Sequence, residues 1–139
     1  MDPTAPDVHD LRERLAASPF HASIGIEAVE ASPGLVRLAV EARPEHRNLQ
    51  GTVHGGLLAT LADTAMGLAV RTAIEPGRRH ATAEMTVHFL RPAAPGRIEA
   101  LGSVVRAGAT IAFAEAEVRD ERGDLLAIAR GTYSVTHPS

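Results

Sequence analysis

The chain has 139 residues, 14 basic and 17 acidic, and a formal net charge of −3. This length is typical of one domain that buries roughly two thirds of its unfolded surface, and the acidic balance argues against nucleic-acid binding through the overall field. The chain contains no cysteine, which excludes disulfides, thiol nucleophiles and thiolate metal sites.

The sequence carries no signal for a membrane or for export. Asp63 and Arg71 interrupt the longest apolar run, so that it is too short to cross a bilayer. The N-terminus MDPTAPDVHD lacks the basic-then-apolar layout of a signal peptide. We therefore expect a cytoplasmic protein whose partners include neither membrane nor nucleic acid.

The first elements in chain order are a short helix and a hairpin. Residues 7–17 have apolar side chains at helical spacing, and Ser18 and Pro19 end this predicted helix. Residues 22–30 and 35–42 have the pattern of strands. The turn sequence Ser32-Pro33-Gly34 joins these two strands into a hairpin.

A polar loop and a long helix follow, and then four more strands. The loop covers residues 43–52, the helix covers residues 54–73, and Pro76 and Gly77 close the helix. The four strands are predicted over residues 80–90, 97–106, 110–119 and 125–136, with turn residues between them.

The predicted helix over residues 54–73 has almost no polar face. Thr60, Asp63 and Gly67 form its only polar or small stripe, and a helix that is apolar on all other sides should be buried. A curved antiparallel sheet of five or six strands wrapped around this helix buries it most economically. We therefore predict an α+β protein with the hotdog fold, in which residues 1–19 form an N-terminal segment and residues 20–137 the single domain.

The segment NLQGTVHGGLLATLAD, residues 48–63, carries the strongest functional signal. Gly55 and Gly56 stand where the long helix begins, and the free amides and dipole of a helix start favour a negatively charged ligand group. Asp63 is the one acid on the helix. Because a buried carboxylate is costly unless it is compensated, this residue is a candidate for chemistry.

Three segments together carry a family resemblance. They are the segment 48–63 with Asn48, Gly51, His54, Gly55, Gly56, Leu61 and Asp63, the segment FLRPAAPG at 89–96, and the closing segment GDLLAIARGTYSV. From about residue 20 to residue 135 the chain resembles the hotdog-fold acyl-CoA thioesterases of the phenylacetate-degradation (PaaI-like) type. The resemblance implies hydrolysis of an acyl-CoA thioester. It implies catalytic roles for Asn48, Gly55, Asp63 and Thr82.

The spacing of two of these residues predicts the oligomeric state. Gly55 and Asp63 are eight residues apart, which is about 12 Å along one helix axis. One thioester carbonyl cannot touch both, so the two groups should come from different subunits related by a two-fold axis. We expect an obligate homodimer with two equivalent sites, and a homotetramer built from two such dimers.

The two central residues each have a structural alternative. Asp63 would act as nucleophile or general base, or it would be a buried acid that pairs with an arginine or caps a backbone amide. The Gly55 amide would polarise the carbonyl oxygen, or this glycine would serve only a tight turn into the helix.

Asn48 and Thr82 also have two interpretations. Asn48 contacts the thioester or supports its own loop. Thr82, which alternation predicts to face away from Ala81, Ala83 and Met85, holds the lytic water or is an ordinary strand residue.

The substrate should contact the helix start and the loop before it. The predicted contacts there are His54, Gly56, Leu49, Leu57 and Leu58, of which the leucines would supply apolar walls for the acyl group. The CoA phosphates need exposed cations, and Arg91 is a stronger candidate than Arg78, Arg79 or Arg106.

No cofactor or metal is expected, since CoA is part of the substrate. His80 and His88 are eight residues apart on one predicted strand, too far to ligate one metal ion, and no HExxH motif occurs.

The sequence thus predicts an acyl-CoA thioesterase acting on aryl- or medium-chain substrates. The alternative is a non-catalytic acyl-CoA-binding or regulatory hotdog module. A hotdog dehydratase is a weaker option, because the helix lacks a paired histidine and acid.

Overall fold

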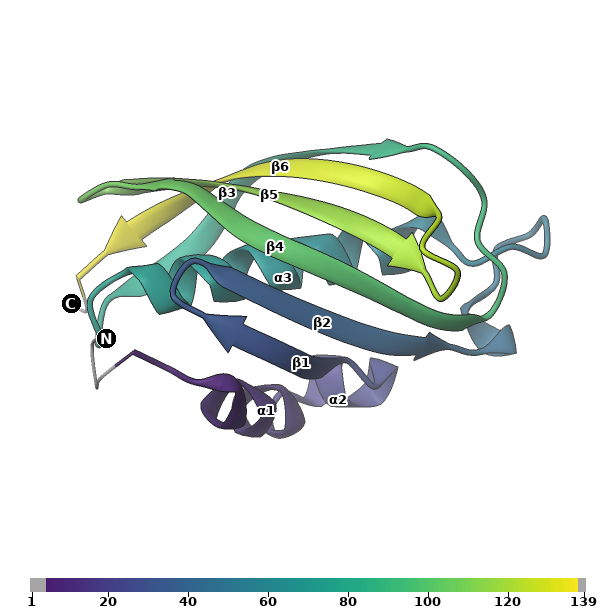
Figure 1. The fold of residues 1–139 in the computed structure, drawn as a ribbon, viewed down its shortest axis with the longest axis horizontal. Helices are drawn as coiled ribbons and strands as arrows, with labels where there is room; N and C mark the ends of the chain where they lie inside the picture. Colours follow the sequence, from purple (N-terminus) through teal and green to yellow (C-terminus); the bar gives the residue numbers. More distant parts are fainter. Residues whose placement is uncertain (1–4, 138–139) are drawn as a thin grey trace.

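A computed structural model describes residues 5–137 of the chain. Six strands form one antiparallel sheet in the order β1-β2-β4-β5-β6-β3. The sheet curves over one long helix, and two short helices lie beside β1 (Figure 1). The elements are α1 (Val8–Ala17), α2 (Pro19–Ile24), β1 (Glu27–Ser32), β2 (Leu35–Ala42), the 3₁₀ turn η1 (Pro44–His46), α3 (Gly55–Ala73), β3 (Arg79–Phe89), β4 (Gly96–Ala107), β5 (Ile111–Asp120) and β6 (Leu125–Thr136).

The predicted hotdog architecture is confirmed. The long helix and five of the six predicted strands lie within a residue or so of their expected bounds. The hairpin turn is also as predicted, because Gly34 adopts the left-handed backbone conformation with φ of 79° that its position requires.

The prediction of a strand over residues 22–30 is wrong in its first half. Pro19 does not only end α1; it also begins α2, where its fixed φ suits the first turn of a helix. Gly25 then ends α2 in the left-handed conformation with φ of 88°. β1 therefore begins only at Glu27.

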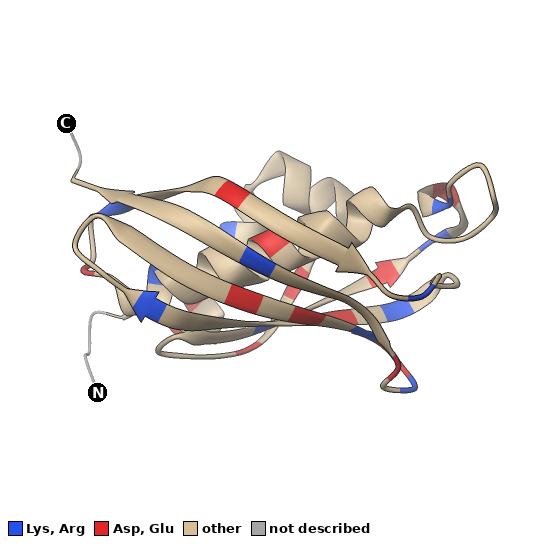
Figure 2. Cartoon of the chain, turned by 90° about the horizontal axis from the view of Figure 1, so that it is seen from above, with Lys and Arg blue, Asp and Glu red and all other residues tan. Residues whose placement is uncertain are grey.

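α3 fills the concave side of the sheet. It contacts every strand from β2 to β6, and Leu61, Ala62, Ala65, Met66 and Ala69 are fully buried. In Figure 2 the ribbon of α3 is almost free of charged residues, which lie mainly on the strands and turns. The few charges on α3 agree with the predicted helix that is apolar on nearly all sides. Burial of these apolar side chains holds α3 under the sheet.

The closest approach between helix and sheet occurs at Gly102 of β4. A Cβ atom added there would overlap the backbone carbonyl group of Ala65 on α3. The missing side chain thus lets the two backbones touch. Ala65 lies two residues beyond Asp63, so this contact also sets the depth of Asp63 under the sheet.

β3 forms one open edge of the sheet, since it pairs only with β6. Most of its 11 residues are exposed in the single chain. None of the helices within residues 5–137 is long and apolar enough to cross a membrane.

We expect Gly102→Ala to lower the free energy of unfolding by about 1 to 3 kcal/mol, because the added methyl group overpacks against backbone that cannot move aside. Urea denaturation measures this loss. Gly67→Ala on α3 is the matched control: its added Cβ would meet side chains only at 3.5 Å, and alanine favours the helix by about 1 kcal/mol. Equal stability of Gly102→Ala and wild type would contradict the close contact.

Candidate active site

Asp63 lies half-buried in the middle of α3, and its carboxylate faces β3 and β6. Its Oδ1 accepts a hydrogen bond of 2.7 Å from the Thr82 hydroxyl and one of 2.8 Å from the Tyr133 hydroxyl. The Tyr133 oxygen also lies 3.2 Å from the backbone carbonyl oxygen of Asp63. Two hydroxyl donors therefore compensate the burial of this charge.

The second carboxylate oxygen of Asp63 remains open. Within residues 5–137, no group donates a hydrogen bond to Oδ2 and no arginine or histidine forms an ion pair with Asp63. The alternative of an aspartate paired with an arginine thus finds no support in the described chain. One oxygen of the carboxylate is available to a substrate or a water molecule.

Thr82 reaches Asp63 because of a bulge in β3. The register between β3 and β6 shifts between Thr82 and Glu84, which leaves Ala83 as the extra residue. Thr82 faces away from its neighbours Ala81 and Ala83, as alternation predicts. Met85, however, packs partly against the core. The expectation that Met85 faces away from Thr82 is therefore wrong, since the bulge returns it to the same face.

His80 adds a neutral ring beside this carboxylate. Its imidazole lies 6.4 Å from the Tyr133 ring, centroid to centroid. Burial, helped by the positive charges of Arg71 and Arg14 and partly offset by Asp63, lowers the pKa of His80 to about 4. At neutral pH His80 therefore supplies no positive charge to Asp63.

The hydroxyl of Tyr133 stays protonated at all ordinary pH values. Burial, the negative charge of Asp63 and the hydrogen bond to that carboxylate raise the pKa of Tyr133. Tyr133 is thus a permanent donor to Asp63.

The start of α3 presents one free amide. His54 caps the helix: its Nδ1 accepts from the Gly56 N–H at 2.8 Å, and its carbonyl oxygen accepts from Leu57. The Gly55 N–H makes no hydrogen bond within residues 5–137. Of the first three amides of α3, only that of Gly55 is therefore free for a ligand.

Phe89, at the end of β3, forms a wall beside this amide. A Cβ atom added at Gly55 would lie 3.1 Å from the Phe89 ring. The ring is half-exposed and lines a surface pocket of about 320 Å³. That pocket brings together four of the predicted site residues, Asn48, Gly55, Leu58 and Arg91.

The other predicted contact residues lie elsewhere. His54, Gly56 and Leu57 line a second pocket, of about 310 Å³, between α3 and η1. Leu49 is fully exposed and lines neither pocket of the single chain. Asp63, further along α3, and Thr82, on β3, line neither pocket.

Asn48 organises its own loop. Its Oδ1 accepts hydrogen bonds from the backbone N–H groups of Gln50 and Thr52, and its Nδ2 donates to the Thr52 hydroxyl at 3.0 Å. This pattern favours a loop-supporting role. A contact with the substrate stays a prediction, for which the second Nδ2 hydrogen is available.

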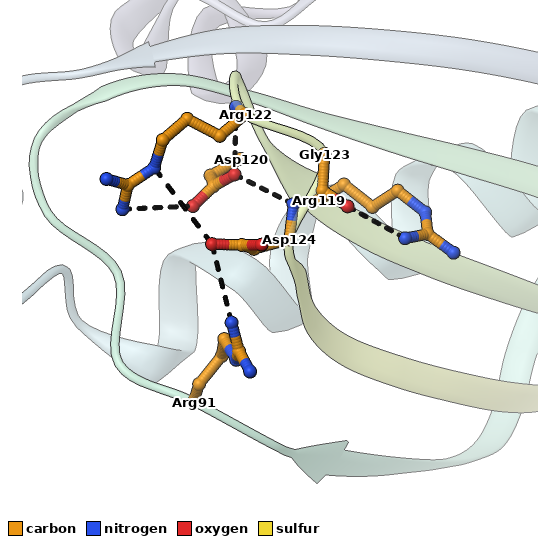
Figure 3. A network of polar contacts seen from close by, with 6 residues as sticks. All are labelled: Arg91, Arg119, Asp120, Arg122, Gly123 and Asp124. Atoms are coloured by element: carbon orange, nitrogen blue, oxygen red, sulfur yellow. Dashed lines mark hydrogen bonds and ion pairs between the residues drawn. The ribbon is translucent and has the colours of Figure 1, made fainter.

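Arg91 is already engaged with an acid. Figure 3 shows it reaching the turn between β5 and β6, where its Nη1 lies 3.4 Å from Asp124 Oδ2. Arg122 also approaches Asp124, at 4.0 Å. Arg91 remains more than half exposed, so a phosphate group could compete for it with Asp124.

Three larger hollows lie away from Asp63 and Gly55. One, of about 620 Å³, is on the outer face of the sheet between β3, β4, β5 and β6, one of about 650 Å³ is between α1, α2 and β1, and one of about 430 Å³ is beside β2, β4 and β5. None of the three is lined by a predicted site residue, so volume alone does not locate the chemistry. Within residues 5–137, no group of three or more histidines and acids is placed to hold a metal ion.

Sequence reasoning missed the site roles of Tyr133, His80 and Phe89. Tyr133 is 70 residues from Asp63 along the chain, and no local pattern links the two. The available signal was that Tyr133 is the single tyrosine of the chain and lies in an apolar closing strand, where a buried hydroxyl needs a partner.

The lowered pKa of His80 predicts a pH dependence of stability. The pKa of His80 is about 4 in the folded chain and 6.5, its ordinary value, in the unfolded chain. At a pH between these two values, the unfolded chain binds a proton at His80 that the folded chain does not. The free energy of unfolding should therefore fall as the pH is lowered through this window. Urea denaturation at several pH values should show a smaller fall in His80→Gln than in wild type. His88→Gln, at an exposed residue of the same strand, should follow wild type; an unchanged slope in His80→Gln would contradict the assignment.

The chain has clear relatives among known proteins. The model of a family described as the thioesterase superfamily matches residues 50–127, more than half of the sequence. A protein of Halobacterium salinarum named as an esterase is 39% identical over 126 residues, 81% of each chain. Acyl-coenzyme A thioesterase 13 of Homo sapiens is 34% identical over 109 residues, 77% of each chain.

A solved structure supports the same fold. The PaaI protein from the phenylacetic acid degradation operon of E. coli matches with a TM-score of 0.83 at 22% identity, over 91% of this chain and 90% of the PaaI chain. The chain therefore belongs to the thioesterase superfamily, as a thioester hydrolase with the PaaI-like hotdog fold.

Proposed function

We propose that the protein hydrolyses an aryl- or medium-chain acyl-CoA to the free acid and CoA. The observation that carries the proposal is the environment of Asp63, a carboxylate on an apolar helix with two hydroxyl donors on one oxygen and a free second oxygen. The relative named acyl-coenzyme A thioesterase 13 supports the substrate class. We expect the protein to act in the cytoplasm, without a metal or a cofactor other than the CoA of the substrate.

The reaction replaces a C–S bond by a C–O bond. Asp63, or a water molecule that Asp63 deprotonates, adds to the thioester carbonyl carbon. The free Gly55 N–H donates to the carbonyl oxygen while that oxygen carries negative charge. Collapse of this intermediate breaks the C–S bond, and the leaving CoA thiolate takes up a proton. If Asp63 itself attacks, water then cleaves the resulting anhydride.

The two groups act from different chains of an obligate homodimer. Both lie on α3, with Gly55 at its first turn and Asp63 about 12 Å further along the axis. The open edge strand β3 supports this arrangement, because it carries Thr82 against Asp63 and Phe89 against Gly55. A second chain added along this edge would cover its unpaired backbone groups. Two such dimers then form a homotetramer.

The surfaces beside Gly55 suit different parts of an acyl-CoA substrate. The pocket with Leu58 and Phe89 has apolar walls for the acyl or pantetheine carbons. Arg91 at the rim of this pocket is our candidate to bind a CoA phosphate, which would replace Asp124 as the partner of its guanidinium group. Asn48 holds the loop that leads into this pocket.

Asp63→Asn should abolish most thiol release from a panel of aryl- and medium-chain acyl-CoA substrates, because the amide can neither attack nor accept a proton. Thiol release measured with a chromogenic disulfide reagent tests this. Thermal unfolding of the variant should match wild type closely, which excludes a folding defect. Ligand-dependent stabilisation without thiol release by the wild type would instead favour an acyl-CoA-binding module.

A heterodimer of two inactive chains tests the shared site. Gly55→Pro removes the amide hydrogen and adds a ring at the first position of α3, where proline is well accepted after the extended His54. We expect it to lower kcat about 100- to 1000-fold. A purified heterodimer of Gly55→Pro and Asp63→Asn chains should regain about half of the wild-type activity, since one of its two sites is intact.

The heterodimer has a matched control. Gly55→Ala keeps the amide hydrogen and places the same Cβ beside Phe89, so it should retain far more activity than Gly55→Pro. If each site belonged to one chain, the heterodimer would contain no intact site. Absence of recovered activity would therefore refute the shared site.

A further inference from the structure

The hydroxyl group of Tyr133 is directed at Asp63. The side chain is 1% exposed, and its hydroxyl lies 2.8 Å from Oδ1 and 3.2 Å from the backbone carbonyl oxygen of Asp63, beside the hydroxyl of Thr82. A buried hydroxyl that is left unpaired destabilises the fold, whereas phenylalanine would fill the same space without that risk. Packing alone therefore does not account for a tyrosine here.

The backbone next to Tyr133 makes room for its ring. Gly131 lies two residues earlier on β6 and faces the same side of the sheet. A Cβ atom added at Gly131 would lie only 2.8 Å from Cε2 of the Tyr133 ring and 3.3 Å from the end of Met66 on α3. The ring thus occupies the space that a side chain at this position would take, and its hydroxyl is directed at α3.

Tyr133 and Thr82 act as one unit. They are directly opposite each other in the ladder between β6 and β3, and their hydroxyl groups converge on the same oxygen of Asp63. Rotation about the last side-chain bond of an aspartate is broad and nearly two-fold, so its two oxygens ordinarily exchange. Two donors on Oδ1 from one cross-strand pair oppose that rotation.

We propose that Tyr133 is a positioning residue of the hydrolytic site: together with Thr82 it holds Oδ1 of Asp63, so that the carboxylate reacts through Oδ2. The inference rests on the proposed thioesterase function. Oδ2 carries the lone pairs that attack the thioester or take the proton from water, while Oδ1 stays hydrogen-bonded throughout the reaction.

Tyr133→Phe keeps the ring and removes the donor. We expect kcat to fall about 10-fold, as for the loss of one hydrogen bond to a charged group, with KM within about twofold of wild type. The acid limb of the kcat/KM profile should move to higher pH, because a donor that favours the ionised carboxylate is gone. The other charged and titratable groups of these surroundings, Arg14, Arg71 and His80, are unchanged in this variant. They therefore do not account for a shift of the profile.

Two further variants complete the kinetic test. Thr82→Val should give a similar loss, and the double variant should lose more than the product of the two single losses, because only then is the carboxylate free to rotate. Ser134→Ala is the matched control. It removes the neighbouring hydroxyl of β6, which bonds to the Ala81 carbonyl oxygen on an exposed part of the sheet, and should leave kcat and the pH profile unchanged.

A spectroscopic measurement tests the contact without relying on turnover. The chain has one tyrosine and no tryptophan, so the near-ultraviolet absorption band of tyrosine reports Tyr133 alone. At neutral pH this band should lie at shorter wavelength in Asp63→Asn than in wild type, because the Tyr133 hydroxyl then no longer donates its hydrogen bond to a charged oxygen.

The outcomes separate this inference from the proposed function. Absence of thiol release by wild type would refute the thioesterase function, while the tyrosine absorption band would still test the contact. With an active wild type, unchanged kcat and pH profile in Tyr133→Phe would overturn the positioning role. An identical tyrosine absorption band in Asp63→Asn and wild type would overturn the contact itself.

Discussion

α3 can be buried only by a sheet that bends around it, because its apolar side chains point in nearly every direction. The other features follow from this constraint. β4 approaches so closely that Gly102 meets the backbone at Ala65, and the hydroxyl of Thr72 accepts the N–H of Gly34, which ties the first hairpin to the end of the helix. Once the sheet is wrapped this tightly, a carboxylate on the side of α3 that faces the sheet must find its partners on the strands.

Asp63 is the one acid of α3, and its surroundings explain how a negative charge is kept on an apolar helix. Hydroxyl groups, not cations, stabilise it. An arginine in contact would neutralise the carboxylate and occupy both of its oxygens, whereas two hydroxyl donors on one oxygen leave the other free. The neutral ring of His80 fits the same design, since burial lowers its pKa to about 4.

The edge strand β3 connects the two ends of the candidate site. Near its start the bulge at Ala83 turns Thr82 toward Asp63, and at its end Phe89 covers the first turn of α3. A strand that is unpaired on one side is a surface for association, and here it carries residues that touch both functional groups. The thioesterase reaction we propose therefore depends on the same edge that would join two chains.

The sequence by itself determined the long buried helix, the hairpin turn at Gly34 and the spacing between Gly55 and Asp63, because these depend on local periodicity and backbone rules. It was misleading over residues 22–30, where Pro19 and Gly25 bound a short helix. Only the tertiary structure decided which groups meet Asp63. Tyr133 lies 70 residues away, and Thr82 faces α3 together with Met85 because of one bulge. Such contacts arise from the register between strands, which no local pattern encodes.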